Sequence, residues 1–313
     1  MGRFLAGRIA QAVPTLIIVS LAVFFLMRLI PGDPAAVMLG DLATPDQVEA
    51  MRQSMGVSGP LARQYWVWIS AILSGDFGKS ITTGDPVLPL MLGRFAVSAT
   101  IVVAAIALAA LIAVPLGMLA AWRQGSLTDL GLVGASTLLL SLPSFWLGLM
   151  ILLVFGLWLQ WFPIVGYVPF SDDPRQALLF VVMPILTLVL VEIGPIVRMA
   201  RASTIEVARL EYISHARAKG LSEPAVVWRH AFKNAFAPTW TLLGLMLGSL
   251  LGGIAVTETV FTIPGLGRLL VEAIYARDYP VVQGCILFIS FNYVLVNLVV
   301  DLFYPYFDPR LSQ

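Results

Sequence analysis

The side chains best suited to chemistry are the two histidines, His215 and His230, which both lie in one basic stretch, residues 198–238. A histidine that acts as a metal ligand or as a general acid or base works with carboxylates, thiolates or further imidazoles at suitable spacing. The sequence does not surround these two with a set of Asp, Glu or Cys residues that would complete such a site. We therefore expect no catalytic residue and no metal site in this chain.

A second motif resembles a phosphate-binding loop. Residues 75–80 read Gly-Asp-Phe-Gly-Lys-Ser, which ends like the pattern G-x-x-x-x-G-K-[ST]. The first glycine of that pattern would fall on Leu73, Asp76 stands where phosphate would approach, and no buried strand precedes the loop. We expect an ordinary loop, and a chain that binds no nucleotide or other cofactor and does not hydrolyse ATP itself.

Glu192 is an acidic residue within an apolar run long enough to cross a membrane. Ionisable side chains in such runs are costly and often functional. Glu192 also lies only six residues before Arg198, so its carboxylate could instead reach the membrane surface. Both interpretations stay open: a place on a transport pathway or gate, or a position near the cytoplasmic surface.

The composition indicates the elements that must hold these residues. Hydrophobic residues make up 59% of the 313 residues and charged residues 12%, about half the charged share of a globular domain. Several apolar runs approach the roughly 20 residues that span a bilayer as a helix. We predict an all-α membrane protein with one domain, residues 1–313. The net charge of +1 gives no electrostatic case for nucleic acid, and the single Cys285 excludes an internal disulfide.

The apolar runs predict six membrane helices, with Pro143 bending the third. Their approximate ranges are 10–29, 95–121, 130–159, 178–197, 239–256 and 281–300. Residues 30–94 would form an extracytoplasmic segment, with a turn at Pro31-Gly32-Asp33-Pro34. In that segment a short helix would be capped by Thr44 and stopped by Gly56, and an aromatic-rich piece from Tyr65 would lie at the lipid headgroups.

The distribution of basic residues predicts the orientation. Six spans place both termini on one side, and Lys and Arg are denser in the parts on that side, chiefly because seven of the nineteen lie in residues 198–238. Basic residues favour the cytoplasmic side. We therefore expect cytoplasmic termini.

The basic stretch has strong helix signals. Ser203–Ala218 contains no proline or glycine and has helical periodicity, Gly220 can end it in a left-handed conformation, and Ser222 can cap a second helix that Pro238 ends. Such a loop could attract anionic lipid, at about 1 kcal/mol for each basic residue near the surface. It could instead dock a protein, or hold the weak histidine site described above.

Motifs along nearly the whole chain resemble the permease subunits of bacterial ATP-binding-cassette importers, most closely the first permease of the dipeptide/oligopeptide/nickel branch. The motifs are Pro31-Gly32-Asp33-Pro34, Gly75-Asp76-Phe77-Gly78-x-Ser80, Ser141-x-Pro143-Ser144-Phe145-Trp146, Arg198-x-x-Arg201-Ala202, Ala216-Arg217-Ala218-Lys219-Gly220-Leu221, His230-x-x-x-Asn234-x-x-x-Pro238, Phe261-x-Ile263-Pro264-Gly265-x-Gly267, Arg277-Asp278-Tyr279-Pro280 and Asp308-Pro309-Arg310.

The resemblance implies a six-helix type I importer permease of the bacterial inner membrane that contains a cytoplasmic coupling helix. Its partners would be a second homologous permease, two cytoplasmic ATPases that use ATP and Mg²⁺, and an extracytoplasmic binding protein. The ATPase-coupling residues it implies are Ser214, His215, Ala216, Arg217, Ala218, Lys219, Gly220, Leu221, His230 and Asn234. The chain departs from the usual Glu-Ala-Ala motif by reading Ser214-His215-Ala216 at that place.

Two further groups of residues have open roles. Gly244, Gly248 and Gly252 have G-x-x-x-G spacing, which permits close helix packing, within the bundle or against the second permease, and could also line the pathway. Pro264, Gly265, Gly267 and Asp278 lie where the family meets its binding protein. For the glycines, turn formation is the simpler interpretation and the one we favour.

The resemblance implies alternating access, with short peptides as the leading substrate class. Nickel chelates, glutathione, opines and sugars are alternatives carried by the same branch. An ion-coupled secondary transporter would need coupling acids or broken helices near mid-membrane, usually with internal repeats. A membrane-embedded enzyme would need clustered His, Asp or Glu within the spans, where only Glu192 qualifies.

Overall fold

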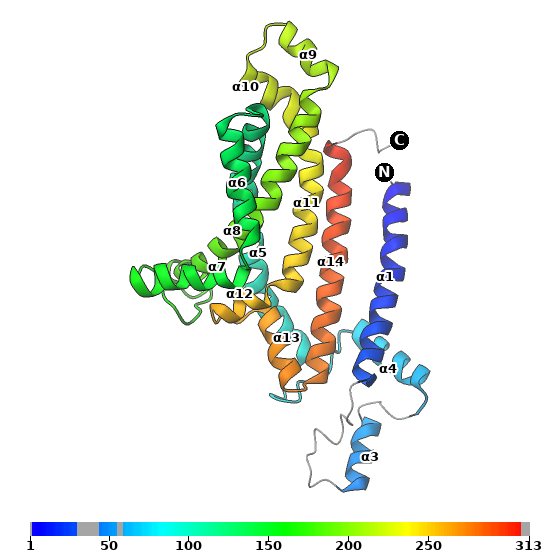
Figure 1. Ribbon diagram of the computed structural model, residues 1–313. Coiled ribbons are helices and arrows are strands. Elements are labelled where there is room, and N and C mark those ends of the chain that lie inside the picture. The colour runs from blue at the N-terminus through cyan, green and yellow to red at the C-terminus, as the bar shows by residue number, and fades with distance from the viewer. Residues whose placement is uncertain (1, 30–43, 55–58, 308–313) are drawn as a thin grey trace.

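The protein is described by a computed structural model that covers residues 2–29, 44–54 and 59–307. These residues are predominantly helical, with one isolated β-bridge between Lys79 and Pro86 (Figure 1). The helices are α1 (Gly2–Leu29), α3 (Pro45–Ser54), α4 (Leu61–Leu73), α5 (Val87–Trp122), α6 (Leu127–Ser141), α7 (Ser144–Ile151), α8 (Pro174–Ala208), α9 (Glu211–Ala218), α10 (Glu223–Ala225), α11 (Phe232–Gly253), α12 (Ala255–Val260), α13 (Leu266–Tyr275) and α14 (Tyr279–Phe307), with π-helical segments η1 (Leu152–Trp158) and η2 (Val226–Ala231). The motifs predicted at Pro31–Pro34, Gly56 and Asp308–Arg310 lie outside the described residues.

The all-α fold class is confirmed, with four or five candidate membrane spans among the described residues. The four are α5, α8, the helical stretch Glu223–Gly253 and α14, and the bent pair of α6 with α7–η1 makes a fifth if it counts as one span. The apolar part of α1, Ala10–Leu26, is shorter than these.

The helix predicted over residues 130–159 is broken rather than only bent. α6 ends at Ser141, and the following pair of elements runs at 97° to it. Leu142 is extended (ψ 129°) because the ring of Pro143 disfavours helical geometry in the preceding residue. Figure 1 shows α7 lying crosswise to the other long helices.

Several other helices are longer than predicted. α5 begins at Val87, directly after Pro86, and α8 begins at Pro174, where the Asp173 carboxylate accepts hydrogen bonds from the next backbone N–H groups. The prediction that Pro238 ends the second helix of the insert is wrong, because Pro238 lies inside α11. A proline in a packed membrane helix is tolerated where neighbouring groups satisfy the freed carbonyl.

The main core lies between α5, α8 and α11. Buried Ala109, Val197 and Leu243 belong to it. A Cβ on Gly117 of α5 would lie 2.6 Å from the Val197 carbonyl oxygen, so these two helices pack backbone to backbone. α14 covers α11, and α1 lies along α14 (Figure 1).

The two ends of this bundle differ in what they carry. α9 and α10 project from one end, near the first turn of α1 and the last turn of α14 (Figure 1). α3, α4 and α13 lie at the other end. We call these the loop end and the opposite end. At the opposite end α4 is fastened to α1, since the Arg28 guanidinium donates to Gln64 Oε1 (2.9 and 3.0 Å).

Candidate functional site

The projecting loop at the loop end is built on a small apolar core of its own. The buried members of this core are Val207, Ile213, Ala216, Val226, Ala231 and Ala235, and Trp122 at the end of α5 packs against them. This core holds the loop together, although Leu210, Leu221 and Trp228 remain exposed on its surface.

The loop does not begin with one long helix. The prediction of a continuous helix over Ser203–Ala218 is wrong, since α8 ends at Ala208 and α9 starts at Glu211. Leu210 between them has extended backbone (ψ 144°). No proline or glycine marks this break; it allows Ile213 to enter the small core, where it is fully buried.

Gly220 ends α9 as predicted. Its φ of +78° lies in the left-handed region, its N–H donates to the Arg217 carbonyl (2.9 Å), and the N–H of Leu221 donates to the Ala216 carbonyl (3.4 Å). This is the hydrogen-bond pattern of a glycine-capped helix end. Among the described residues, no atom would lie within 4 Å of a Cβ placed on Gly220. Ser222 stands at the N-cap position of α10, although its side chain makes no cap bond.

A polar cluster that was not predicted from the sequence holds the turn after α9. The Arg217 guanidinium donates to both carboxylate oxygens of Glu223 (2.9 and 3.2 Å), and the Trp122 indole N–H donates to the same carboxylate (2.6 Å). Arg217 also lies over the Trp122 ring, 5.2 Å from its centroid. The cluster ties both halves of the loop to the end of α5.

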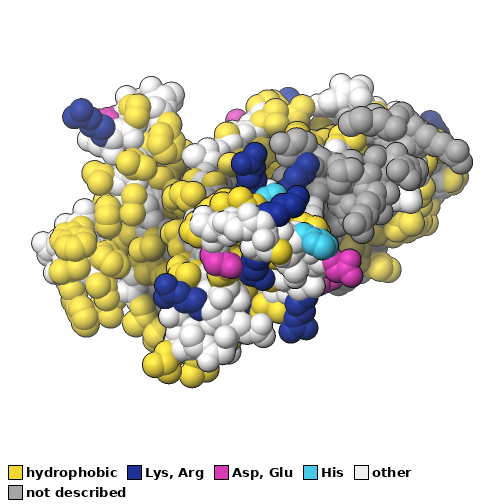
Figure 2. Space-filling model, turned by 90° about the horizontal axis from the view of Figure 1, so that it is seen from above, with side chains coloured by type: hydrophobic (Ala, Val, Ile, Leu, Met, Phe, Trp, Pro, Cys, Tyr) yellow, Lys and Arg dark blue, Asp and Glu magenta, His cyan; other side chains and the backbone are white. Residues whose placement is uncertain are grey.

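The residues predicted to couple to an ATPase do not all reach the surface. Figure 2 looks onto the loop end and shows basic and histidine side chains gathered there. Ala216 is buried in the loop core and His230 is half-buried. Asn234 donates to the Tyr212 hydroxyl (2.7 Å). The exposed predicted residues are Ser214, His215, Arg217, Ala218, Lys219, Gly220, Leu221 and Asn234.

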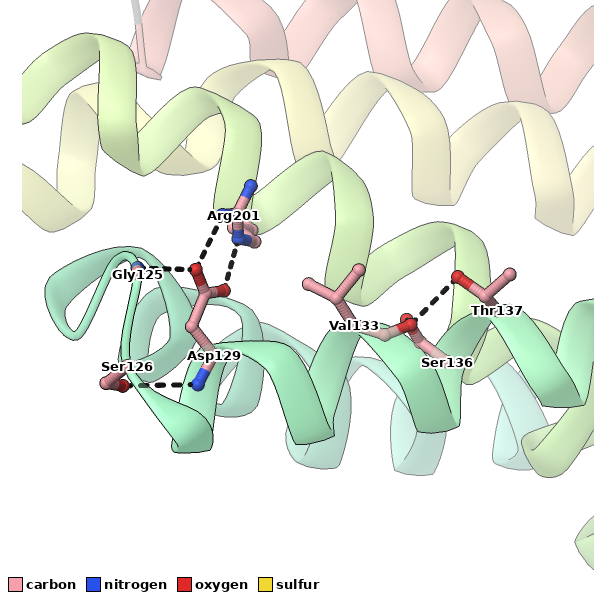
Figure 3. A network of polar contacts seen from close by, with 7 residues as sticks. All are labelled: Gly125, Ser126, Asp129, Val133, Ser136, Thr137 and Arg201. Atoms are coloured by element: carbon pink, nitrogen blue, oxygen red, sulfur yellow. Dashed lines mark hydrogen bonds and ion pairs between the residues drawn. The ribbon is translucent and has the colours of Figure 1, made fainter.

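An ion pair fixes the base of the loop (Figure 3). The Arg201 guanidinium, on α8, donates to both oxygens of Asp129 on α6, at 2.6 and 2.7 Å. Asp129 is 5% exposed and also accepts from the N–H of Gly125 (3.0 Å), while its own N–H donates to the Ser126 hydroxyl. Arg201 belongs to a motif found in the sequence, but its partner is 72 residues away and carried no sequence signal.

The glycines of α11 lie against α14. Cβ atoms placed on Gly244, Gly248 and Gly252 would collide with the side chains of Val300, Tyr293 and Ile289, respectively. Close packing within the bundle, one of the interpretations above, is therefore what these glycines do here. A role in lining a pathway stays a prediction.

Glu192 lies in the middle of α8 and is half-buried. Ile185, Leu188 and Ile196, which share its helix face by spacing, are all buried. In the described part of the chain, no basic group forms an ion pair with the Glu192 carboxylate. It is therefore an acid held in the apolar interior of the bundle, and its part in a pathway or gate stays a prediction.

The opposite end contains a buried carboxylate, Glu258 on α12, that was not predicted from the sequence. It is 1% exposed and accepts hydrogen bonds from the Ser98 hydroxyl (2.5 Å) and the backbone N–H of Arg268 (2.7 Å). The Ser98 oxygen accepts in turn from the N–H of Leu266 (2.8 Å). Glu258 and Ser98 together satisfy the first turn of α13, a place where anionic groups are favoured.

Opposing effects set the pKa of the Glu258 carboxyl. Burial raises the pKa, whereas the hydrogen bonds from Ser98 and the backbone and the charge of Arg94 act in the other direction. Burial is the largest effect, so the pKa lies above its ordinary value.

Close packing constrains both glycines predicted at this end. Gly265 has φ −97°, and a Cβ on it would overlap the Glu258 carboxylate. Its N–H also donates to the Ile263 carbonyl (2.9 Å), so Gly265 closes a tight turn around Pro264 as well. Gly267 lies inside α13, where a Cβ would be 2.7 Å from the backbone nitrogen of Ala255, so the turn interpretation is wrong for Gly267. The left-handed residue of this segment is Thr262, with φ +58°.

Asp278 fastens the segment that resembles a phosphate-binding loop. Its carboxylate accepts from the Ser80 hydroxyl (2.5 Å) and from the hydroxyl and N–H of Thr82 (3.2 and 3.3 Å). Asp278 is 2% exposed, so it shapes this surface from beneath. Asp76 accepts from the N–H of Gly78 (2.9 Å), which closes an ordinary Asx-turn.

Comparison with known proteins covers nearly the whole chain. Residues 113–313 match the family described as binding-protein-dependent transport system inner membrane component, and residues 1–111 match the corresponding N-terminal family. A putative peptide transport system permease protein of Brucella suis is 40% identical over 311 residues, 99% of each chain. The di/tripeptide transport system permease protein DppB of Pseudomonas aeruginosa is 36% identical over 331 residues, 99% of this chain and 98% of its own. The glutathione transport system permease protein GsiC of Pectobacterium atrosepticum is 37% identical over 312 residues, 99% of each chain.

These matches agree with the resemblance drawn from the motifs and with an all-helical bundle that carries a projecting basic loop. The chain thus belongs to the binding-protein-dependent transport system inner membrane components, the non-catalytic permease subunits of ABC transporters.

Proposed function

We propose that this permease forms, with a second homologous permease, the pathway of an ATP-driven importer of short peptides. The names of the relatives support the substrate class, since two of those compared are peptide or di/tripeptide permeases. Six spans are proposed: the four candidate spans, the bent pair counted as a fifth, and α1 as the sixth. Transport would proceed by alternating access.

The observation that carries this proposal is the construction of α9. This short helix has buried Ile213 and Ala216 on one face and exposed His215 on another, and exposed Lys219 follows as its C-cap. We propose that this face docks on a cytoplasmic ATPase, so that residues 198–238 transmit its closure to α8 and α11. ATP and Mg²⁺ would be bound by the two ATPase subunits, and this chain would bind no cofactor.

The same proposal gives the orientation. The loop end would face the cytoplasm of a bacterium, with both termini, because the basic loop lies there. The opposite end would face the extracytoplasmic binding protein. Pro264 would contribute to that surface, with Gly265, Gly267 and Asp278 supporting it from within.

Replacing Gly220 by Glu tests the docking face. The left-handed backbone would be strained and a charged side chain would project into the space in front of α9, so we expect loss of ATPase co-purification and an uptake rate at least about tenfold lower. Gly84→Glu is a matched control, because Gly84 has the same φ of +78° and the same open surroundings at the opposite end. Normal substrate-stimulated ATPase activity in the reconstituted Gly220→Glu complex would refute the docking proposal.

An ion-coupled secondary transporter is the rival class. Uptake by the two permeases alone, driven by an ion gradient without ATPase subunits, would establish that rival. The substrate class is tested by identifying the ligand that the cognate binding protein retains. A peptide supports the proposal, whereas a nickel chelate, glutathione, an opine or a sugar would show that the importer carries that solute instead. Glutathione has specific support from one relative.

We also propose that Glu192 acts on the pathway or at a gate. Glu192→Gln keeps the side-chain shape while removing the charge, and we expect a change in uptake rate of about fivefold or more. Glu206→Gln, an exposed site on the same helix, is the control. Uptake unchanged by Glu192→Gln would remove Glu192 from the mechanism.

A further inference from the structure

A cavity of about 440 Å³ opens at the opposite end of the bundle. The first turns of α5 form one wall, the segment between η1 and α8 forms another, and Pro264 contributes to its lining. The volume falls in the range of small-molecule sites, roughly 300–1,000 Å³. Arg94 and Tyr167 are its polar side chains with no hydrogen bond among the described residues, and Phe170 adds an aromatic surface.

Arg94 is a cation without a counter-ion at this cavity. It lies seven residues into α5, about 10 Å along the helix. Among the described residues, no carboxylate lies within the 4.0 Å of an ion pair with its guanidinium. Arginine in a membrane helix is rare and usually faces a cavity or a partner charge. Arg94 is therefore available to bind an anion that the described residues do not supply.

Glu258, whose carboxyl is influenced by the charge of Arg94, already has hydrogen-bond partners. The Glu258 carboxylate is taken by the Ser98 hydroxyl and by backbone N–H groups at the start of α13. Because these donors satisfy both of its oxygens, Glu258 has no need of Arg94. The guanidinium keeps its donors for a group in the cavity.

Tyr167 supplies a second donor in the lining of the same cavity. Burial raises the pKa of its phenol, and the charge of Asp172 raises it further, so the hydroxyl stays protonated and can donate. The hydroxyl of Thr100, also in the lining, already donates to the Ala96 carbonyl (2.8 Å). A guanidinium and a phenol on an otherwise apolar wall match a carboxylate attached to an apolar body.

From this geometry we infer that the cavity is a transfer site for the C-terminal carboxylate of a short peptide, which passes there as the binding protein releases it. Arg94 would bind the carboxylate, Tyr167 would add a hydrogen bond, and Phe170 with Pro264 would contact the side chains. This inference rests on the proposed function.

The test varies the charge at position 94 and measures peptide transport and ATP hydrolysis. The proteoliposomes contain both permeases and both ATPases, and the binding protein is saturated with a tripeptide. Arg94→Gln is expected to lower the number of peptides transported per ATP hydrolysed about tenfold, while ATPase stimulation by the loaded binding protein stays within about twofold. Arg94→Lys keeps the charge and is expected to retain most transport. Arg175→Gln, an exposed arginine at the same end, is the control and is expected to have no effect.

A chemical rescue distinguishes loss of the positive charge from a folding defect of the variant. Arg94→Cys would be assembled first and then treated with a cationic or a neutral thiol reagent; the native Cys285 is fully buried. Recovery of transport with the cationic reagent alone is the expected result.

Three results would overturn the transfer site: unchanged coupling in Arg94→Gln, equal rescue by the neutral reagent, or a parallel loss of ATPase stimulation, which would place Arg94 against the binding protein. Failure of the wild-type complex to import any peptide would instead overturn the proposed function, and the transfer site with it.

Discussion

The two ends of this permease use polar residues in opposite ways. At the loop end the ion pair of Arg217 and Glu223 is open to solvent, with side-chain exposures of 39% and 51%. At the opposite end Glu258 and Asp278 are 1% and 2% exposed, and hydrogen bonds engage their carboxylates. Exposed charge leaves a surface available to a partner, whereas buried charge must be satisfied by the chain itself. The Arg217–Glu223 pair therefore leaves a charged surface open to solvent, whereas Glu258 and Asp278 hold neighbouring segments together.

Glycines show the same contrast. Gly220 has a left-handed backbone, and no described atom lies within 4 Å of a Cβ placed on it, so the constraint on Gly220 is its backbone conformation. Gly265 has an ordinary backbone and no space, because the Glu258 carboxylate lies where a Cβ would be. Substitutions at the two ends should therefore separate loss of stability from loss of coupling.

The largest effect on stability is expected from Glu258→Ala. Removal of the carboxylate leaves the Ser98 hydroxyl and the Arg268 N–H buried without their acceptor, at a cost of about 3 kcal/mol in the free energy of unfolding. Thermal unfolding of the purified complex in detergent measures it. Glu272→Ala removes an exposed carboxylate from the neighbouring α13 and should cost less than about 0.5 kcal/mol. Equal losses for both variants would contradict the contrast between buried and exposed carboxylates.

The next largest effect on stability is expected from Gly265→Ala. The added methyl group overpacks the Glu258 site, so the free energy of unfolding should fall by about 2 kcal/mol. Gly220→Ala should lower the free energy of unfolding by about 1 kcal/mol, which is the energy an L-residue needs to adopt the left-handed conformation. No described atom lies within 4 Å of the added Cβ. The same unfolding measurement compares them. If Gly220→Ala proved the more damaging variant, contact with a partner rather than backbone strain would have to explain it.

The smallest effect on stability is expected from Glu223→Gln. The ion pair with Arg217 is solvent-exposed, so its loss should change the free energy of unfolding by about 0.5 kcal/mol or less. If the cluster orients α9 for docking, stimulated ATPase activity should fall more than stability does. A variant that loses stability and activity in proportion would show that the cluster only holds the loop together.

Local signals in the sequence predicted much of this molecule. The left-handed end of α9 at Gly220 follows from glycine's freedom of φ. The place of the disruption at Pro143 was also predicted, although as a bend rather than the break that the structure shows. The capping of α3 by Thr44 is also as predicted, since the Thr44 hydroxyl accepts from the N–H of Gln47 (3.4 Å). Each of these depends on a few neighbouring residues.

The missed features depend on residues distant in the sequence. Glu258 meets Ser98 across 160 residues and Asp129 meets Arg201 across 72, and neither pairing has a local signal. No proline or glycine marks the break at Leu210. The break accompanies the burial of Ile213 in the loop core, which depends on residues from several helices.

The lengths of the hydrophobic runs, the placement of charge and the family motifs are properties of the linear chain, so they predict a helical membrane permease with a basic loop. Tertiary packing brings together residues distant in the chain, so it fixes which polar groups are buried together and which face outward. Gly265 illustrates the difference: its type is visible in the sequence, but its reason is the carboxylate of Glu258, brought beside it by the fold.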